Sequence, residues 1–329
     1  MNSIDRRQLV TLALAVMGAF SLGAAAQSAY PAQTLKIIVP FTPGTGMDTI
    51  ARVVAPRLSE RLGQPVVVQN QPGASGNIGA EAVAKSNPDG YTVLIHHNGM
   101  STAPALYRKM AFNPLTDFEY ISQVVDVPMT LLGRKDLPAK NLQELSTYVK
   151  ANAKSINLAN AGLGAVSHLC GMLFQQAMGV DLTTVPFSGT APAMNALLGG
   201  QVDLLCDQTT QTVPLIKDGR VKVYGVTTLT RLSALPNVPT LDEQGLKGFK
   251  VKVWHGMYAP KGTPAPVLKK LNDALKAAVK DPDFIRKQES GGATVITDAR
   301  NDPAGHKNFV MSEVAKWAPV IRAGGIYAD

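Results

Sequence analysis

Residues 39–48 read VPFTPGTGMD and lie between an expected strand and an expected helix. The apolar run 35–39 leads into this stretch, and apolar residues at helical spacing follow it over residues 48–62. Two prolines and two glycines end the strand and allow a tight turn. Such a turn brings free backbone N–H groups to a helix N-terminus, where the helix dipole also favours an anion. The stretch therefore predicts one half of a carboxylate-binding site.

Strands and helices alternate after this loop. Residues 65–69 and 91–95 are expected strands, and between them lie a glycine-rich loop at 70–77 and a helix that continues to Ala84. This order predicts an α/β fold with a parallel sheet and right-handed crossovers. Ligands of such sheets gather beyond the carboxyl ends of the strands. The loops at Thr42, Gly73 and His96 are therefore expected on one edge of the sheet.

A second series of strands and helices follows a less regular stretch at 110–128. Strands are expected at 156–159, 182–186, 202–205, 221–226 and 251–258, and helices at 141–153, up to 178, and at 193–198, 266–280 and 303–322. The last strand and the last two helices read as a return to the first unit. We therefore expect one lobe of residues 27–126 plus 250–329, a second lobe of residues 127–249, and a hinge with two crossings.

The loop at 160–168 repeats the pattern of the opening loop, with glycines between a strand and a helix. Two facing loops of this kind can hold a carboxylate by main-chain N–H groups, helped by hydroxyls of Thr45, Ser167 or Thr190. The alternative is that each glycine only permits a tight turn. The corresponding positions of the two loops favour the binding interpretation.

Charge and targeting signals limit the partners. The net charge is +8, but lysines and arginines are scattered and no block interleaves them with aromatic residues, so we expect no nucleic-acid binding. Residues 1–26 read as a signal peptide, with Arg6 and Arg7, an apolar segment and an Ala-Ala-Ala cleavage site. Export by the Sec or the twin-arginine route remains open, and either predicts a soluble periplasmic protein.

The sequence offers no convincing catalytic or metal site. Ser167 and His168 are adjacent on a helix, so their side chains diverge and do not form a nucleophile–base pair. His96 and His97 at a strand end point to opposite sides, which argues against a metal. We therefore expect no enzyme activity, no metal and no cofactor. His255 and His306 are isolated, and we expect each to be a surface or hydrogen-bonded structural histidine.

The chain has two cysteines, Cys170 on an expected helix and Cys206 at the end of an expected strand. A disulfide is permitted in an exported protein, but pairing cannot be deduced from the sequence. We interpret the two residues as small buried apolar side chains.

Several motifs in order resemble the solute-binding receptors of tripartite tricarboxylate transporters, the Bug family. The match extends over nearly the whole chain after residue 26. The matching motifs are IVPF (38–41), GTGMD (44–48), NQPGASGNIG (70–79), PDGYT (88–92), the loop 162–168, LGGQVD (198–203), LPNVPT (235–240), WHG (254–256) and APKGTP (259–264). Each motif is modest alone, and their order makes the resemblance specific.

The resemblance implies a type II periplasmic-binding-protein fold, in which each lobe has a mixed, mostly parallel sheet flanked by helices. It implies a receptor that closes on a small carboxylate and delivers it to a membrane permease, and we expect a monomer. In such receptors loop backbone groups and ordered water hold the carboxylate. The positions carried over are Phe41, Gly44, Thr45, Gly46 and Asp48 on one lobe, and Gly164, Ala165, Ser167 and His168 on the other, with Thr190 and Asp207 nearby.

Departures from the family pattern bear on the choice of acid. Thr45, Met47 and Ala165 stand where the family usually has a glycine, a small polar residue and a hydroxyl residue. His96 and Asn98, in place of small residues, offer donors for a distant second carboxylate. We therefore expect an aromatic or medium-length dicarboxylate resembling terephthalate. A sensing role with a membrane sensor, or binding of citrate or an amino acid, are the alternatives.

Overall fold

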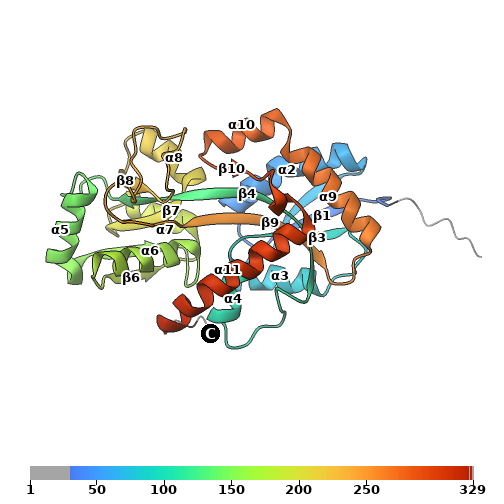
Figure 1. The fold of residues 1–329 in the computed structure, drawn as a ribbon, viewed down its shortest axis with the longest axis horizontal. Helices are drawn as coiled ribbons and strands as arrows, with labels where there is room; N and C mark the ends of the chain where they lie inside the picture. The colour runs from blue at the N-terminus through green and yellow to red at the C-terminus, as the bar shows by residue number, and fades with distance from the viewer. Residues whose placement is uncertain (1–29, 326, 328–329) are drawn as a thin grey trace, which may run out of the picture.

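Two long strands, β4 (Phe118–Gly133) and β9 (Lys252–Pro260), connect the two halves of the molecule (Figure 1). The structure, a computed structural model, describes residues 30–325 and 327, so the expected signal peptide lies outside the described residues. β4 pairs antiparallel with β9 from Phe118 to Pro128. From Met129 to Gly133 it pairs instead with the strands of the other half. One mixed sheet therefore continues through both halves. Its strand order is β2 (Val66–Asn70), β1 (Leu35–Val39), β3 (Thr92–His96), β9, β4, β7 (Leu204–Gln208), β5 (Asn157–Asn160) and β6 (Thr183–Pro186).

The half that contains β1 (Leu35–Val39), β2 (Val66–Asn70) and β3 (Thr92–His96) is called lobe 1 here. β1 is parallel to both β2 and β3, which confirms the predicted parallel sheet. Its helices and remaining strand are α2 (Gly46–Leu62), α3 (Asn77–Ala84), α4 (Gly99–Leu106), α9 (Ala265–Val279), α10 (Pro282–Ser290), α11 (Pro303–Ala323) and β10 (Thr294–Val295), with short 3-10 turns at Ala74–Gly76 and Ala299–Asn301. Neither α4 nor α10 was predicted from the sequence.

The other half is called lobe 2. Its strands are β5 (Asn157–Asn160), β6 (Thr183–Pro186), β7 (Leu204–Gln208) and β8 (Lys222–Val226), and its helices are α5 (Leu142–Asn152), α6 (Val166–Met178), α7 (Thr190–Leu198) and α8 (Thr209–Lys217), with a 3-10 turn at Ala153–Ser155. β5 is parallel to β6 and β7. The exact lobe boundaries predicted at residues 126/127 and 249/250 remain a prediction.

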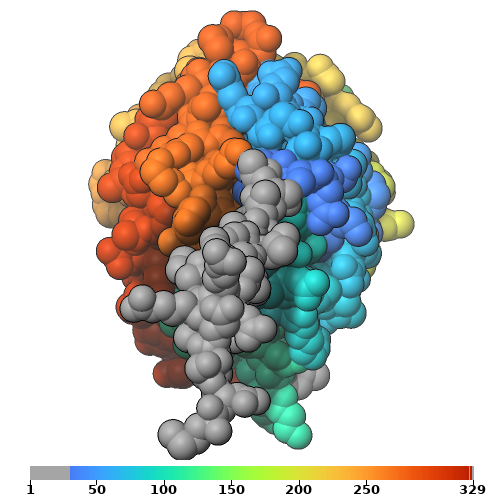
Figure 2. Space-filling model, turned by 90° about the vertical axis from the view of Figure 1, so that its right-hand side faces the viewer, coloured from blue at the N-terminus to red at the C-terminus, as the bar shows by residue number. Residues whose placement is uncertain are grey.

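The chain returns to lobe 1 after lobe 2. On that end of the molecule, α9 and α10, drawn in orange, lie against the blue N-terminal segments (Figure 2). Arg57 of α2 pairs with Asp281, the N-cap of α10, at 2.8 Å. The last helix, α11, also reaches lobe 2, because Trp317 and Ile321 share a buried apolar cluster with Leu106 of α4 and Leu169 of α6. Within the described ranges, no helix combines the length and apolar character needed to cross a membrane.

The expectation of a less regular stretch at 110–128 is correct for residues 110–117 and wrong for residues 118–128. Most of that stretch belongs to β4, a strand of 16 residues in which only Glu119 is more than slightly exposed. Both faces of β4 are covered, so its sequence lacks the alternation that reveals a half-buried strand. Buried polar residues such as Ser122, Gln123 and Asp126 also interrupt its apolar run.

The interpretation of Cys170 and Cys206 as unpaired is also wrong, because the two residues form a disulfide. Cys170 lies on α6 and Cys206 on β7, and both are fully buried in the main apolar core. α6 packs on β7 and brings the two Cα atoms within 6.1 Å, inside the range that a disulfide spans. Only the tertiary packing creates this proximity.

The disulfide predicts a measurable loss of stability on reduction. It links residues 36 apart in the sequence, and closing a loop of that length stabilises a fold by about 4 kcal/mol in the chain-entropy account. Urea unfolding of the oxidised and reduced protein should therefore give a clearly lower midpoint for the reduced form. The control is the Cys170→Ala/Cys206→Ala double variant, whose midpoint should not respond to reductant. Equal midpoints for oxidised and reduced wild type would contradict the assignment.

Candidate functional site

Residues from most of the sequence motifs described above line a cavity between the two lobes. Its inner part, about 70 Å³, is lined by Phe41, Thr42, Thr45, Met47, His97, Met129, Ala161, Ala165, Val166, Ser167, Ser188, Gly189, Thr190, Asp207, Gln208, Val253 and His255. An adjoining outer part of about 380 Å³ shares Phe41, His97 and Ala165 and also includes residues of the Gly73 loop. Thr42, Gly73 and His97 thus meet at one edge of the sheet, as the parallel order of β1, β2 and β3 predicts.

Four helices begin at the inner cavity. The N-cap residues of α2, α6, α7 and α8 all line it, and they are Thr45, Ala165, Gly189 and Gln208. The first N–H groups of each helix have no partner within the helix, and the helix dipole places partial positive charge there. Among the described residues that line either part of the cavity, there is no lysine or arginine. The site therefore offers an anion backbone donors and helix dipoles in place of cationic side chains.

The loop before α2 is held by its own side chains. Gly44 has φ +83°, a conformation that favours glycine. Its N–H donates to Asp48 Oδ2 at 2.9 Å, and Arg52 Nε donates to the same oxygen at 2.9 Å. Burial alone raises the pKa of Asp48, but hydrogen bonds from Arg52, Gly44 and Asn70 outweigh burial and lower it. Asp48 lines neither part of the cavity, so its role in the structure is to hold the loop.

The hydroxyl of Thr45 has a similar role. It donates to Thr42 O at 3.1 Å and accepts from Asp48 N at 3.4 Å, which caps α2. These bonds orient the first turn of the helix toward the cavity. Gly44 and Gly46 do not line the cavity themselves, whereas Phe41 and Thr45 do.

Side chains of the first turn of α6 hold the loop before that helix by hydrogen bonds. Gly164 N–H donates to His168 Nδ1 at 3.1 Å, and Ala161 N–H donates to Ser167 Oγ at 2.8 Å. Ser167 lines the inner cavity with its hydroxyl proton still available, whereas His168 is buried behind the loop. Ala165 lines both parts of the cavity, and Gly164 lines the outer part. The predicted ligand contacts of these residues remain a prediction.

The structure exchanges the expected roles of His96 and His97. His96 is buried away from the cavity, where its Nδ1 accepts from His97 N at 2.8 Å and its ring bonds to the Gly76 backbone. His97 lines both parts of the cavity, because successive side chains at the end of β3 face opposite sides. Its Nδ1 accepts from Gly99 N at 3.0 Å, so the neutral ring carries its proton on Nε2 as a donor. Burial lowers the pKa of His97 to about 4, which keeps it neutral at pH 7.

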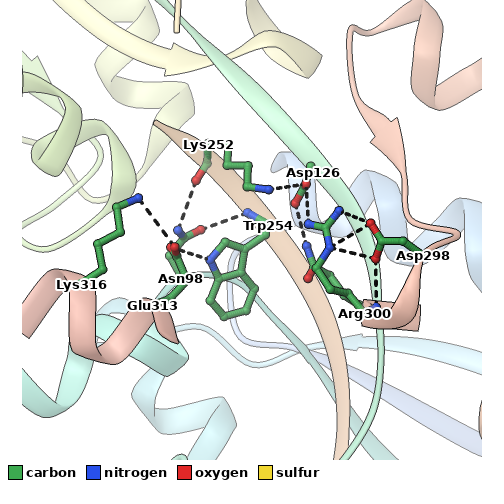
Figure 3. A network of polar contacts seen from close by, with 9 residues as sticks. Asn98, Asp126, Lys252, Trp254, Asp298, Arg300, Glu313 and Lys316 are labelled. Atoms are coloured by element: carbon green, nitrogen blue, oxygen red, sulfur yellow. Dashed lines mark hydrogen bonds and ion pairs between the residues drawn. The ribbon is translucent and has the colours of Figure 1, made fainter. Parts of the chain in front are cut away.

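Asn98 does not line the cavity; it fixes the backbone of β9 (Figure 3). Its amide donates to Lys252 O at 3.2 Å and accepts from Trp254 N at 3.0 Å. The Trp254 indole in turn donates to Glu313 Oε2 on α11 at 3.3 Å. Val253 and His255, which alternate with these residues on β9, line the inner cavity. The position predicted as a donor for a second carboxylate is therefore a structural support for β9.

Asp126 of β4 also holds β9 in place, through ion pairs. Its carboxylate pairs with Lys252 and, at 2.8 Å, with Arg300 (Figure 3). Arg300 also pairs with Asp298 at 2.6 Å. The network ties β4, β9 and the segment before α11 together behind the cavity.

Asp207 is the acidic residue of the inner cavity and is only 3% exposed. Its Oδ1 accepts from Gln208 N at 2.7 Å, while Oδ2 is buried and has no partner among the described residues. Burial raises the pKa of Asp207 to about 7, against the opposing effect of hydrogen bonds from Gln208 and the Thr190 hydroxyl. Thr190 and Asp207, expected near the site, both line the cavity.

His255 and His306 are buried and do not lie at the surface. The expected hydrogen bonds are missing at both ring nitrogens of His306 and at Nδ1 of His255 within the described chain. His306 packs instead among the rings of Tyr120, Tyr258 and Trp254. Burial lowers the pKa of both histidines to about 3. Nowhere in the described ranges do three or more His, Cys, Asp or Glu side chains gather as a metal site would require.

Several residues that line the inner cavity were not predicted from the sequence: His97, Met129, Ser188, Gln208, Val253 and His255. The N-cap positions of α7 and α8 carried a usable signal, since each follows the end of a strand on the same sheet edge. The β9 residues carried none, because the lobe-crossing strands are buried on both faces.

The two lobes touch across the inner cavity. Gln211 of α8 donates to Gly44 O at 3.4 Å. A Cβ atom added at Gly46 would lie 2.2 Å from Gln208 Nε2, and one added at Gly164 would lie 2.0 Å from Leu106 Cδ1. The absence of a side chain at these two glycines thus permits the close approach of the lobes.

Comparisons with known proteins agree with this geometry. Residues 50–326 match the protein family described as tripartite tricarboxylate transporter family receptor, TctC. The chain is similar to the solved periplasmic binding protein BugD, with 49% identity and a TM-score of 0.86 over 91% of this chain and 99% of BugD. MatC from Rhodopseudomonas palustris, solved with bound malate, is 38% identical with a TM-score of 0.83 over 89% of this chain and 100% of MatC. Another R. palustris protein, solved with adipate, is 34% identical with a TM-score of 0.85 over 91% and 99% of the two chains.

The contact between Gly46 and Gln208 predicts an effect on closure. Gly46→Ala should weaken ligand binding about tenfold, because the added methyl group displaces the Gln208 side chain and holds the lobes apart. A double-mutant cycle with Gln208→Ala tests the cause, since Gly46→Ala should have little further effect when that side chain is absent. Titration calorimetry with an acid that wild type binds gives the affinity of wild type, of each single variant and of the double variant. Equal losses in both backgrounds would contradict the closure account.

Proposed function

Because the chain belongs to the tripartite tricarboxylate transporter receptor family, it is a solute-binding receptor and not an enzyme, and we propose that it captures a small dicarboxylate between its lobes. The observation that carries the proposal is the convergence of four helix N-termini on one cavity without a cationic side chain among the described lining residues. Three of these helices, α6, α7 and α8, belong to lobe 2, and the fourth, α2, belongs to lobe 1. A carboxylate between them would attract both lobes at once.

The inner cavity suits one carboxylate group. Its volume is about 70 Å³, whereas a cavity needs about 10–15 Å³ by this measure to hold one water molecule. A hydrogen bond to a charged group contributes about 1.5–3 kcal/mol. A few cooperating N–H groups from the first turns of α2 and α6, with the hydroxyl of Ser167, can therefore offset the loss of hydration.

The outer cavity suits the rest of the ligand. Its volume of about 380 Å³ and its lining of Phe41, His97, Leu106 and Phe187 fit an aliphatic chain or an aromatic ring. Nε2–H of His97 is the donor that we assign to a second carboxylate. Malate and adipate, bound by two similar proteins, support the dicarboxylate class. Phe41 and His97 contact each other, with ring centroids 4.9 Å apart, and this aromatic lining favours a flat or medium-length acid resembling terephthalate.

The proposal includes the partner and the compartment. We place the receptor in the periplasm, as a monomer that presents its closed, loaded form to the permease of a tripartite tricarboxylate-type transporter. Capture in the closed form is consistent with the close approach of the lobes at Gly46 and Gly164.

Calorimetric titration with adipate, terephthalate, citrate and glutamate tests the ligand class. We expect the tightest binding for terephthalate or adipate, because Met47 and Ala165 offer no hydroxyl-binding groups for citrate. Each bound acid should also raise the unfolding temperature, as ligands that bind only the folded state must. Tightest binding of citrate or glutamate would contradict the proposed class, and no binding of any acid would contradict the proposed function.

A further inference from the structure

Asp207 is an acidic side chain that lines a cavity proposed to bind anions. It is the acidic side chain among the described lining residues, and no lysine or arginine there neutralises it. An ionised Asp207 would repel a carboxylate at close range, and the low local dielectric would make that repulsion large. Some property of Asp207 must remove this conflict if the cavity binds acids.

The groups around Asp207 do not supply a counter-charge. α7 and β5 carry no ionisable side chain, and on α8 the only one is the exposed Lys217 at the far end of the helix. α6 contributes His168, and His97 and His255 face the cavity from lobe 1. On β4, Thr130 lies opposite Asp207, and Asp126 is already paired with Lys252 and Arg300. Burial lowers the pKa of each of these three histidines, to about 4 for His97 and about 3 for His255, so they are neutral near pH 7.

The two carboxyl oxygens of Asp207 differ in their hydrogen bonding. Oδ1 accepts the N–H of Gln208 at 2.7 Å, which suits a carbonyl oxygen. The Thr190 hydroxyl also acts on this carboxyl group, but Oδ2 is buried and has no hydrogen-bond partner among the described residues, so it is the oxygen that would carry a proton. Burial raises the pKa of Asp207 to about 7, so the protonated form is populated at neutral pH.

We propose that Asp207 meets the ligand as a neutral acid that donates the proton on Oδ2 to a ligand carboxylate oxygen. The inference rests on the proposed function, because it requires a carboxylate ligand. No covalent bond of the ligand changes; an ionised Asp207 takes one proton from solvent as the ligand binds, and that proton is then shared between two oxygens. A neighbouring carboxylate further favours the protonated form of Asp207.

This role makes Asp207 a specificity-determining residue. A ligand that presents an ammonium group would instead require ionised Asp207, and its affinity would rise with pH. A dicarboxylate requires the neutral form, and its affinity must fall as Asp207 ionises. The direction of the pH dependence therefore separates the two kinds of ligand.

The test is calorimetric titration of the full protein with adipate from pH 6 to pH 9, in two buffers of different ionisation enthalpy. Adipate is ionised above pH 7, so its own protonation does not contribute to the slope. Wild type should take up close to one proton per ligand at pH 9, and its affinity should fall about 50-fold between pH 7 and pH 9, as linkage to a group of pKa about 7 requires. Asp207→Asn should bind with no proton uptake and little pH dependence. Asp218→Asn, an exposed change on the same lobe, should behave like wild type.

The outcomes separate the two proposals. Binding of adipate by wild type without proton uptake overturns the role of Asp207 but leaves the proposed function intact. Affinity that rises with pH also overturns it, because the ligand then uses ionised Asp207. Failure of every dicarboxylate to bind wild type at any pH overturns the proposed function, and this inference with it. Absence of proton uptake by wild type overturns the role of Asp207 even if Asp207→Asn does not fold.

Discussion

A carboxylate that leaves water for the cavity between the lobes must regain its hydration energy from the protein. Within the part of the chain that the structure describes, no lysine or arginine lines that cavity to supply it. The N-termini of four helices supply hydrogen-bond donors instead. The helices are α2, α6, α7 and α8, and their N-cap residues all line the inner part. Backbone donors at helix ends are fixed in place, so little reorganisation accompanies binding.

Much of the surrounding structure holds those helix ends in position. Asp48 and Thr45 form hydrogen bonds with the backbone of the loop before α2, and His168 forms one with the backbone of the loop before α6. Behind the cavity, Asn98 and the Asp126 network hold β9, on which Val253 and His255 complete the lining. Side chains of the family motifs therefore act largely through the backbone that they shape.

The sequence was sufficient for those parts of the fold that local patterns specify. The glycine loops at 39–48 and 160–168, the parallel order of β1, β2 and β3, and the family followed from strand, turn and helix signals. It was insufficient where burial on both faces removes periodicity, as in β4, and where packing alone creates proximity, as for Cys170 and Cys206. A shift of one residue at the end of β3 also decided which histidine lines the cavity, and strand ends are not predictable to that accuracy.

A crystal structure of the protein with adipate would show directly which groups hold the ligand carboxylate. We expect one carboxylate in the inner cavity, with its oxygens about 3.2 Å or less from backbone N–H groups of the first turn of α2 and of at least one helix of lobe 2. We also expect no lysine or arginine within hydrogen-bond distance of that carboxylate. A carboxylate paired with a cationic side chain, or bound outside the cavity between the lobes, would contradict this expectation.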